Sequence, residues 1–278
     1  MNPYQDKVAV ITGAGSGIGR ELAQLLAQRG ARLALSDVDE QGLAETHRRC
    51  GDAVTIRRYR LDVSQRAAVF AHADDVKRDF GGAHFVFNNA GVSLAATFEH
   101  MTIEELEWLL GINLWGVIYG TKAFLPLMLA QREGRIVNIS SIFGFVGVPA
   151  QSAYNISKFA VRGLNECLWA ELEGTGVQVT SVHPGGIRTN IDKAAPLGKF
   201  AGDYEKGVLE TVSRMLVTPP EQCAREIVEG VARGRRRIVT GKSAGLTDLV
   251  ARLSPKHYGK VLAWMGLRGP YAHLGSGR

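Results

Sequence analysis

Short apolar runs alternate with helical patterns along most of the chain. Runs rich in Val, Ile and Leu predict seven β-strands, at residues 7–12, 31–36, 54–61, 84–87, 135–140, 177–182 and 237–240. Apolar residues at helical spacing predict helices at residues 17–29, 103–130 and 152–173. The strands show no alternation of apolar and polar residues, which is typical of parallel strands that helices cover on both faces. The pattern predicts an α/β fold with a doubly wound parallel sheet, three αβα layers and a single domain over residues 1–278.

Two segments depart from this alternation. Residues 190–217 form a long connection of mixed composition, interrupted by Pro196 and by three glycines. Residues 243–278 carry apolar side chains at helical spacing, namely Leu246, Leu249, Val250, Leu253, Val261, Leu262 and Met265. This spacing predicts a pair of amphipathic helices, which we expect to pack against the domain or against a neighbouring subunit.

The composition fits one globular domain. The chain has 278 residues, of which 45% are hydrophobic and 22% charged, enough for a full core. No apolar run approaches the roughly 18 residues that a membrane-spanning helix needs, and the polar start of the chain does not resemble a signal peptide. The three cysteines, Cys50, Cys167 and Cys223, lack metal-ligand spacing and favour a reducing compartment. We therefore expect a cytoplasmic protein without a metal site.

Positive charge is concentrated near the C-terminus. The formal net charge is +6, and residues 225–278 contain eleven Lys or Arg against three Asp or Glu, a net of +8. The rest of the chain therefore sums to about −2. A solvated basic face is the ordinary explanation, and a peripheral contact with an anionic membrane surface is the alternative. No recognition motif for nucleic acid accompanies this charge.

A glycine-rich segment, TGAGSGIG, follows the first predicted strand and opens the first predicted helix. Glycines at this junction allow a tight turn, close approach of the backbone to a pyrophosphate, and close packing of helix on sheet. The free N–H groups at the helix N-terminus also favour phosphate. The segment predicts a Rossmann-type dinucleotide site formed by Gly13, Gly15, Ser16, Gly17, Ile18 and Gly19.

Asp37 follows the second predicted strand, 18 residues after Gly19. A carboxylate at this place accepts hydrogen bonds from adenosine ribose hydroxyls and repels a 2′-phosphate. An Arg or Lys at position 16 or 38 could attract such a phosphate, but these positions hold Ser16 and Val38. The sequence therefore predicts NAD rather than NADP as the cofactor.

Several motifs resemble those of the short-chain dehydrogenase/reductase family, in the same order and over nearly the whole chain. They are TGxxxGxG at Thr12–Gly19, Asp62-Val63, Asn88-Asn89-Ala90-Gly91, the set Asn113, Ser141, Tyr154 and Lys158, and Pro184-Gly185 with Ile187 and Thr189. Within the family the chain is most similar to bacterial alcohol dehydrogenases related to mycobacterial fatty-alcohol and secondary-alcohol enzymes, of the acetoin dehydrogenase-like type. The stretches LALSDVD, GTKAFLP, IVNISSIFG, QSAYNISKFAVRG and VHPGGIRT carry this similarity.

The resemblance implies a role for each matching residue. Asp62, Val63, Asn89, Ala90 and Gly91 would line the adenine and central part of the cofactor cleft. Pro184, Gly185, Ile187 and Thr189 would hold the nicotinamide carboxamide. Ser141 would bind the substrate oxygen, with Ser140 as the alternative, and Asn113 would hold a water that connects Lys158 to solvent. Lys158 would also hold the nicotinamide ribose, and the family usually forms dimers or tetramers.

Tyr154 and Lys158 suit proton transfer to and from an alcohol oxygen. They are one helical turn apart and therefore share a face of the predicted helix. An ammonium beside a phenol favours the phenolate, so we expect Lys158 to lower the pKa of Tyr154. His183 and Arg188, which flank the Pro184 motif, are expected to have structural and loop-packing roles.

The expected substrate pocket lies beyond the carboxyl ends of the strands. It is largely apolar, without a fixed charge for an anionic substrate, and comprises Ser93, Leu94, Ile142, Phe143, Val148, Gly185 and Gly186. Residues 190–217 would form a lid over it. We expect an NAD-dependent dehydrogenase of a hydrophobic secondary or medium-to-long-chain alcohol. A carbonyl reductase or hydroxysteroid-type dehydrogenase, and a non-catalytic dinucleotide sensor, are the alternatives.

Overall fold

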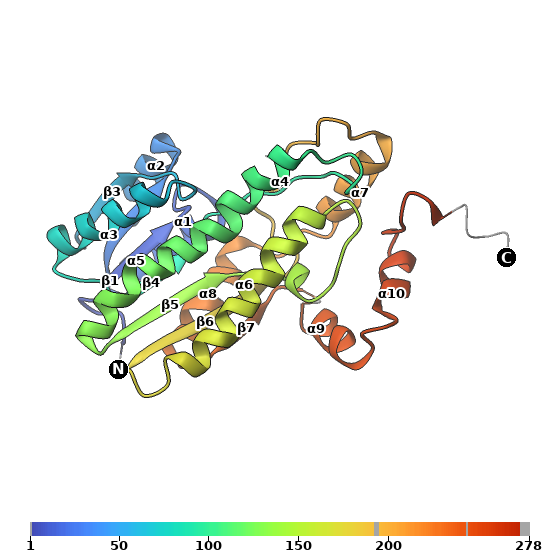
Figure 1. Cartoon of the computed structure of the whole chain (residues 1–278). Helices are drawn as coiled ribbons and strands as arrows, with labels where there is room; N and C mark the ends of the chain where they lie inside the picture. Colours follow the sequence, from blue (N-terminus) through green and yellow to red (C-terminus); the bar gives the residue numbers. More distant parts are fainter. Residues whose placement is uncertain (1, 192–194, 243, 273–278) are drawn as a thin grey trace.

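One parallel sheet organises the chain (Figure 1). The structure is a computed structural model that describes residues 2–191, 195–242 and 244–272. Within these residues seven strands pair in the order β3-β2-β1-β4-β5-β6-β7. Their bounds are β1 Val8–Thr12, β2 Arg32–Asp37, β3 Ile56–Arg60, β4 Phe85–Asn88, β5 Gly134–Ile139, β6 Val177–Pro184 and β7 Arg237–Thr240. The order reverses between β1 and β4, and the crevice at such a point is where open α/β sheets bind ligands.

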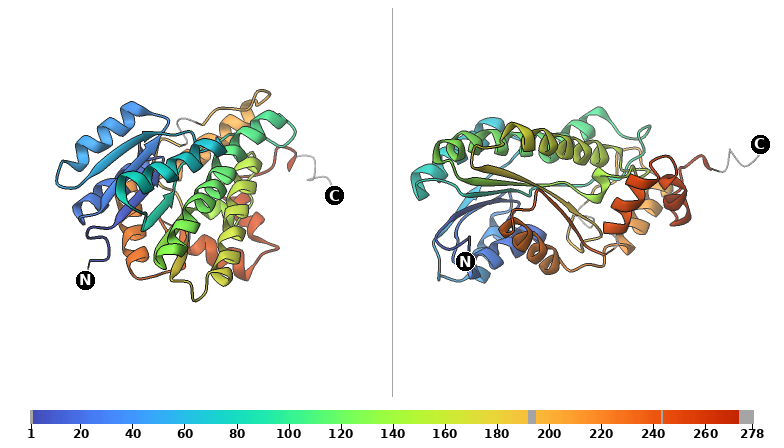
Figure 2. Two further views of the ribbon diagram at one scale, coloured as in Figure 1. Left: turned by 60° about the vertical axis from the view of Figure 1, so that its left-hand side comes forward. Right: turned by 90° about the horizontal axis from the view of Figure 1, so that it is seen from below.

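Helices cover the sheet on both faces, and Figure 2 shows the resulting three layers. On one face lie α1 (Gly17–Gln28), α2 (Glu40–Cys50) and α8 (Pro220–Ala232), which share a core cluster with the strands. On the other face lie α3 (Arg66–Phe80), α5 (Gly116–Gln131) and α6 (Ser152–Glu171), which share a second cluster. The doubly wound α/β fold predicted from the hydrophobic pattern is therefore confirmed.

The edge strand β3 departs from the predicted pattern. We expected every strand to be covered on both faces, but Arg57, Arg58 and Arg60 of β3 are exposed. The cause is its position, because β3 pairs only with β2 among the strands of the sheet. Charged side chains on an edge strand also discourage pairing with another chain.

A single long helical segment follows the β4 region. It consists of α4 (Ile103–Leu110), a π-helical turn (Gly111–Trp115) and α5. Over Ile103–Gln131 it is long and apolar enough to cross a membrane by length and composition, although the apolar runs of the sequence did not predict such a span. Leu109, Phe124 and Met128 from this segment are buried in the core clusters, as in the core helix of a globular domain.

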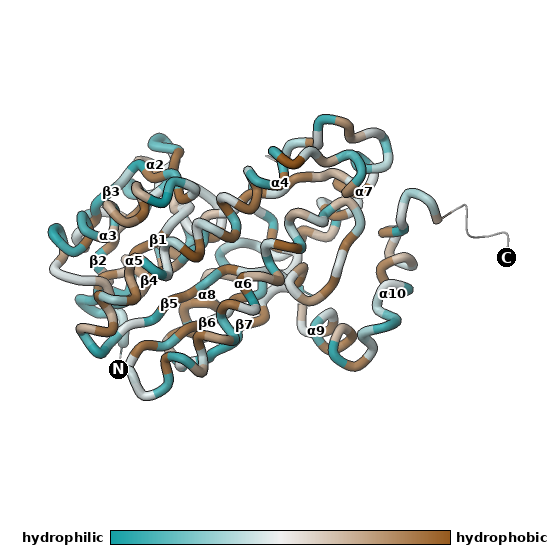
Figure 3. Tube along the Cα trace, in the orientation of Figure 1, coloured by the Kyte–Doolittle hydropathy of each residue, from teal (hydrophilic) through white to brown (hydrophobic). Residues whose placement is uncertain are grey.

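The segments beyond β6 add helices at the carboxyl end of the sheet. They are α7 (Asp203–Arg214), α9 (Ala244–Leu253) and α10 (Tyr258–Trp264). Residues 192–194 of the expected lid, and residues 243 and 273–278 of the expected C-terminal extension, lie outside the described residues. The helix pair expected in this extension is present as α9 and α10, and Figure 3 shows apolar residues along both. In the single chain, however, the stripe Leu246, Leu249 and Leu253 faces solvent.

Candidate active site

The glycine loop joins β1 to α1 through a backbone that requires glycine. Gly13 and Gly17 have φ of +66° and +52°, a region that other residues rarely adopt. A Cβ at Gly13 would lie 2.8 Å from Ala90 Cα, and a Cβ at Gly19 would overlap the Gly13 carbonyl. Ser16 precedes α1 without a side-chain hydrogen bond to the helix end. The loop thus offers backbone N–H groups at close range, which suits the pyrophosphate of a dinucleotide.

Asp37 lies at the end of β2, beside this loop. Its carboxylate accepts hydrogen bonds from Gly15 N at 2.8 Å and from Asp39 N at 3.0 Å. Arg20 in the first turn of α1 donates to the Gly15 carbonyl and to Thr46 Oγ1. The negative side chain therefore borders the cleft, while the positive one is engaged with the protein.

The segment after β4 is fastened to the glycine loop. Asn89 Nδ2 donates to the Thr12 and Gly13 carbonyls at 3.0 and 3.2 Å. Thr12 Oγ1 accepts from the backbone N–H groups of Asn89 and Ala90. These bonds hold the two neighbouring strand ends at a fixed separation and shape the floor of the cleft.

Tyr154 and Lys158 project from α6 toward the same cleft. The Lys158 Nζ atom lies 5.4 Å from the centre of the Tyr154 ring and donates to the Ile139 carbonyl at 3.0 Å. Burial lowers the pKa of Lys158 to about 8. Burial raises the pKa of Tyr154 to about 12, although a hydrogen bond with Ser141 acts in the opposite direction. The pKa of Tyr154 is therefore raised among the protein groups alone, and not lowered as expected, because burial outweighs the hydrogen bond with Ser141.

The two serines at the end of β5 have different partners. Ser140 is buried, and its hydroxyl donates to the Lys158 backbone carbonyl at 2.8 Å. Ser141 caps the short helical turn Ile142–Gly144, where its Oγ accepts from Phe143 N at 3.1 Å. The same Oγ lies 3.5 Å from the Pro184 carbonyl. Ser141, which the spacing favoured over Ser140, is the serine whose hydroxyl forms a hydrogen bond with the Tyr154 phenol.

Asn113 lies in the π-helical turn between α4 and α5. Its Oδ1 accepts from Val92 N and its Nδ2 donates to Val92 O, both at 2.8 Å. The amide is fully buried and locked onto the segment after Gly91. A Cβ at Gly91 would lie 3.2 Å from Asn113 Oδ1 and 3.7 Å from Lys158 Nζ, so this glycine lets both side chains approach the strand end. Single π-turns inside helices frequently mark functional sites.

A cleft of about 480 Å³ brings most of the predicted site residues together. Of the catalytic set, Ser141, Tyr154 and Lys158 line it, and Asn113 lies behind it. The predicted cofactor residues that line it are Gly13, Ser16, Gly17, Ile18, Asp37, Asp62, Val63, Asn89, Ala90, Gly91, Pro184, Ile187 and Thr189. Gly15, Gly19 and Gly185 instead serve close packing behind the lining. These lining residues and the open glycine loop fit a nicotinamide dinucleotide.

The expected substrate pocket is partly corrected. Ser93, Ile142, Phe143 and Gly186 line the cleft. Leu94 packs instead with Leu109, and Val148 packs in a separate apolar cluster, so neither reaches the cleft lining.

Further residues close the cleft from the far side, and only the last five of them belong to the segment 190–217 that was expected to form a lid. They are Val92, Gln151, Asn190, Ile191, Leu209, Val212 and Leu216. Leu209, Val212 and Leu216 have the spacing i, i+3, i+7 and could have been found as one face of a helix. They place α7 over the cleft and make this wall apolar.

The fold and the cleft together define an α/β protein with a dinucleotide-type glycine loop. The chain matches the family model described as short chain dehydrogenase over residues 7–198. It is 45% identical over 267 residues to SadH of Mycobacterium tuberculosis, which is named as an oxidoreductase, with 95% of this chain and 96% of that protein covered.

Solved structures show the same relationship. A short-chain dehydrogenase/reductase from Burkholderia phymatum in complex with NAD superposes with a TM-score of 0.84 at 33% identity, covering 94% of this chain and 97% of that one. A metagenomic short-chain oxidoreductase in complex with NADP superposes with a TM-score of 0.68 at 29% identity, covering 82% and 92%. The chain belongs to the short-chain dehydrogenase/reductase family and is an oxidoreductase of that family.

Proposed function

We propose that the protein is an NAD(H)-dependent oxidoreductase that interconverts a hydrophobic alcohol, secondary or of medium to long chain, and its ketone or aldehyde. The observation that carries this proposal is the convergence of Ser141, Tyr154 and Lys158 on one wall of a cleft whose opposite wall is apolar. Resemblance to bacterial alcohol dehydrogenases supports the same substrate class. A carbonyl reductase or hydroxysteroid-type dehydrogenase is the nearest alternative, because it would use the same groups.

In this mechanism Tyr154 transfers the proton. Bound nicotinamide dinucleotide would supply the hydride acceptor or donor. Because the Tyr154 phenol stays protonated at neutral pH, it can donate to the oxygen of a carbonyl substrate during reduction. In the oxidative direction the phenolate takes the hydroxyl proton of the alcohol. Ser141 Oγ donates to the same substrate oxygen and stabilises its developing charge.

Lys158 and Asn113 support this transfer from behind the cleft. Lys158 would bind the nicotinamide ribose hydroxyls, and its ammonium would stabilise the phenolate as that forms. Asn113, locked on Val92, would hold a water that passes the proton from Lys158 toward solvent. Both roles follow from the family resemblance.

We propose NAD as the preferred cofactor because of Asp37. Its carboxylate borders the cleft at the end of β2, where it would accept from the ribose hydroxyls and repel a 2′-phosphate. Arg20, which is held by Gly15 and Thr46, would not offset this repulsion. Asp37→Ala should weaken NAD binding and raise the relative use of NADP; an unchanged ratio of kcat/KM for the two cofactors would refute the assignment.

We also propose that residues 190–217 act as a lid. Within the described part of this segment, α7 carries the apolar residues Leu209 and Val212 over the cleft. Gly198 and Gly202, which precede α7, would allow it to move on substrate entry. The apolar inner face favours a hydrocarbon chain over a sugar or an anionic group.

The partners are proposals as well. Trp108 and Trp115 on the long helical segment, and Ile156 and Phe159 on α6, are exposed. Exposed apolar groups on neighbouring helices favour association, so we propose a homodimer or homotetramer through this surface. Light scattering after size exclusion would test it: a protein that stays monomeric at micromolar concentration would exclude the proposal. Three free cysteines support a cytoplasmic location.

A peripheral membrane contact is a second partner proposal. Residues 249–278 contain five Lys or Arg and no Asp or Glu, and Trp264 and Leu253 are 85% and 76% exposed. Exposed apolar groups with basic neighbours suit an anionic lipid surface. Co-sedimentation with anionic and with neutral vesicles tests this contact, and equal recovery in the supernatant from both would exclude it.

Turnover is the first test of the proposed function. Purified protein is supplied with NAD or NADP and with primary and secondary alcohols of increasing chain length, and NADH or NADPH absorbance is followed. We expect NAD-selective turnover that rises with apolar chain length. Binding of NAD without turnover across the panel would favour the non-catalytic sensor.

A further inference from the structure

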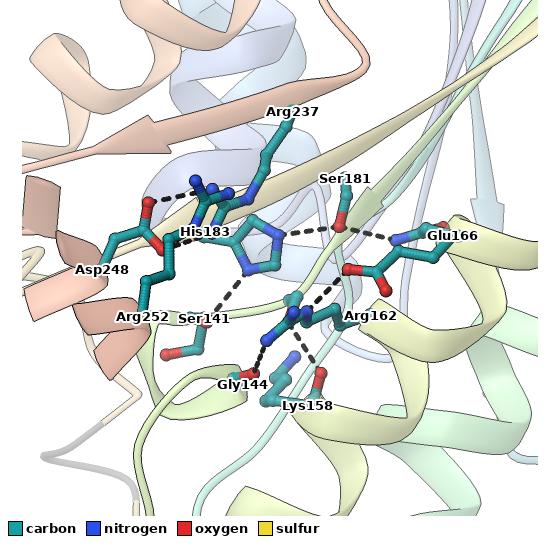
Figure 4. Close-up of polar contacts among 12 residues, drawn as sticks. Ser141, Gly144, Lys158, Arg162, Glu166, Ser181, His183, Arg237, Asp248 and Arg252 are labelled. Atoms are coloured by element: carbon teal, nitrogen blue, oxygen red, sulfur yellow. Dashed lines mark hydrogen bonds and ion pairs between the residues drawn. The ribbon is translucent and has the colours of Figure 1, made fainter. Parts of the chain in front are cut away.

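A chain of buried hydrogen bonds runs behind the active site, through residues that the proposed mechanism does not use. Asn88 of β4, Asn138 of β5, Asn165 of α6, and Ser181 and His183 of β6 are each at most 2% exposed. The bonds join them in that order, with distances of 2.8, 2.7, 2.9 and 2.9 Å. The last bond of the chain joins His183 Nδ1 to the backbone carbonyl of Ser141 at 3.2 Å, and Figure 4 shows this end.

The Ser141 carbonyl fixes which group donates and which accepts in every one of these buried hydrogen bonds. A carbonyl can only accept, so His183 Nδ1 must carry the proton. In the neutral ring Nε2 is then an acceptor, and the Ser181 hydroxyl must donate to it. Ser181 Oγ in turn accepts from Asn165 Nδ2. Each amide upstream therefore points the same way, with its Nδ2 toward His183.

The surroundings keep the His183 ring neutral. Burial lowers the pKa of His183 to about 3, the hydrogen bond with Ser141 acts to raise it, and the charge of Arg237 acts to lower it further. The Phe145 ring covers His183 with 4.2 Å between ring centres. The Arg237 guanidinium carbon lies 4.5 Å from the centre of the Phe145 ring. Asp248 of α9 holds this guanidinium by two hydrogen bonds (Figure 4). The imidazole is thus buried, and each of its two ring nitrogens has one hydrogen-bond partner.

We propose that His183 is a positioning residue for Ser141, and that these buried hydrogen bonds hold it as its Nδ1-protonated tautomer. The proposal rests on the proposed function, in which Ser141 binds the substrate oxygen. The Ser141 backbone carries the hydroxyl that caps the turn Ile142–Gly144. By fixing the Ser141 carbonyl, His183 sets where that hydroxyl meets the substrate.

Substitutions at His183 test the positioning. His183→Leu removes the donor, and we expect kcat for alcohol oxidation to fall by about tenfold to a hundredfold, as for other small displacements of a reacting group, with KM for NAD unchanged. His183→Asn keeps a donor at the place of Nδ1 and should recover most of the lost kcat. His72→Leu is the matched control, because His72 is a buried histidine of α3 whose ring nitrogens have no hydrogen-bond partner among the described residues. This control should leave kcat unchanged.

Nuclear magnetic resonance provides a readout that needs no turnover. The ¹⁵N shifts of labelled histidine distinguish a protonated ring nitrogen from a free one, and we expect His183 to be protonated at Nδ1 alone. The ¹³C shift of the Ser141 carbonyl should change in His183→Leu and return in His183→Asn. A proton on Nε2, a Ser141 shift that ignores His183, or full kcat in a folded His183→Leu would each overturn the proposal. Absence of turnover in the unmodified protein would count against the proposed function alone, because the shifts still decide the role of His183.

Discussion

Removing the Lys158 ammonium should stabilise the protein while it abolishes activity. Lys158 is 3% exposed, and burial lowers its pKa from the ordinary 10.5 to about 8. At 1.36 kcal/mol per pKa unit, this shift means that holding the charged group in the fold costs about 3 kcal/mol at neutral pH. Lys158→Met removes that cost but also loses the hydrogen bond to the Ile139 carbonyl, worth about 1 kcal/mol. The free energy of unfolding should therefore rise by about 2 kcal/mol.

The pH dependence separates this effect from better packing by methionine. Between pH 8 and 10.5 the folded protein binds fewer protons at Lys158 than the unfolded chain does, so the unmodified protein gains stability as the pH rises through this window. The variant has no such group. Its advantage should be full below pH 8 and should fade as the pH approaches 10.5.

Urea unfolding at pH 7 and at pH 10, at one fixed protein concentration, measures both quantities. Lys122→Met on α5 is the matched control, because Lys122 is exposed and its replacement should change the free energy by less than about 0.5 kcal/mol. If Lys158→Met were less stable than the unmodified protein at pH 7, or if the difference did not depend on pH, the reasoning from burial would be refuted.

Three further predictions concern the proposed reaction. Tyr154→Phe should retain NAD binding by calorimetry and lower kcat by about 10²- to 10⁴-fold, because only the proton-transferring hydroxyl is removed; near-normal kcat would exclude Tyr154 as the acid and base. Because burial raises the pKa of Tyr154 to about 12, the phenol is protonated at neutral pH, so the oxidation rate should rise steadily as the pH is raised above 7, without a plateau below the pKa, while reduction does not; a flat oxidation profile would contradict this. Glu205→Gln should raise KM for long-chain alcohols more than KM for NAD, because the buried Glu205 carboxylate ties α7 to Thr97 and His100 at 2.9 and 2.7 Å. A KM for long-chain alcohols equal to that of the unmodified protein would show that this contact does not shape the lid.

Local patterns explain what the sequence could predict. The strands, the glycine loop and the Tyr154–Lys158 pair each lie within a few residues of chain, so their spacing alone defines them. Asp37 was found in the same way, from its place after the second strand. Their convergence on one cleft then follows from the parallel sheet, because parallel strands bring their carboxyl ends to one edge.

Features that depend on burial could not be predicted from the sequence. The raised pKa of Tyr154 comes from desolvation, which depends on neighbours such as Phe143 that pack against the ring only in the fold. The exposure of Leu249 and Leu253 also departs from what an apolar stripe predicts, because periodicity shows which residues share a face and not what covers that face. Asn138 and Asn165 carried no signal at all, since they lie on different elements and their role appears only when β5 and α6 meet.

The end of β5 shows why structural and proposed catalytic roles cannot be separated in this protein. The Ile139 carbonyl accepts from Lys158 Nζ, and the Ser141 carbonyl accepts from the His183 ring. The Ser140 hydroxyl returns a bond to the backbone of α6 at Lys158. The strand end is therefore held by the same side chain that would bind the nicotinamide ribose, and by a histidine that has no place in the proton transfer. A change at any of these groups moves the backbone that carries Ser141, so we expect such variants to alter kcat through geometry even where the proton-transferring groups are intact.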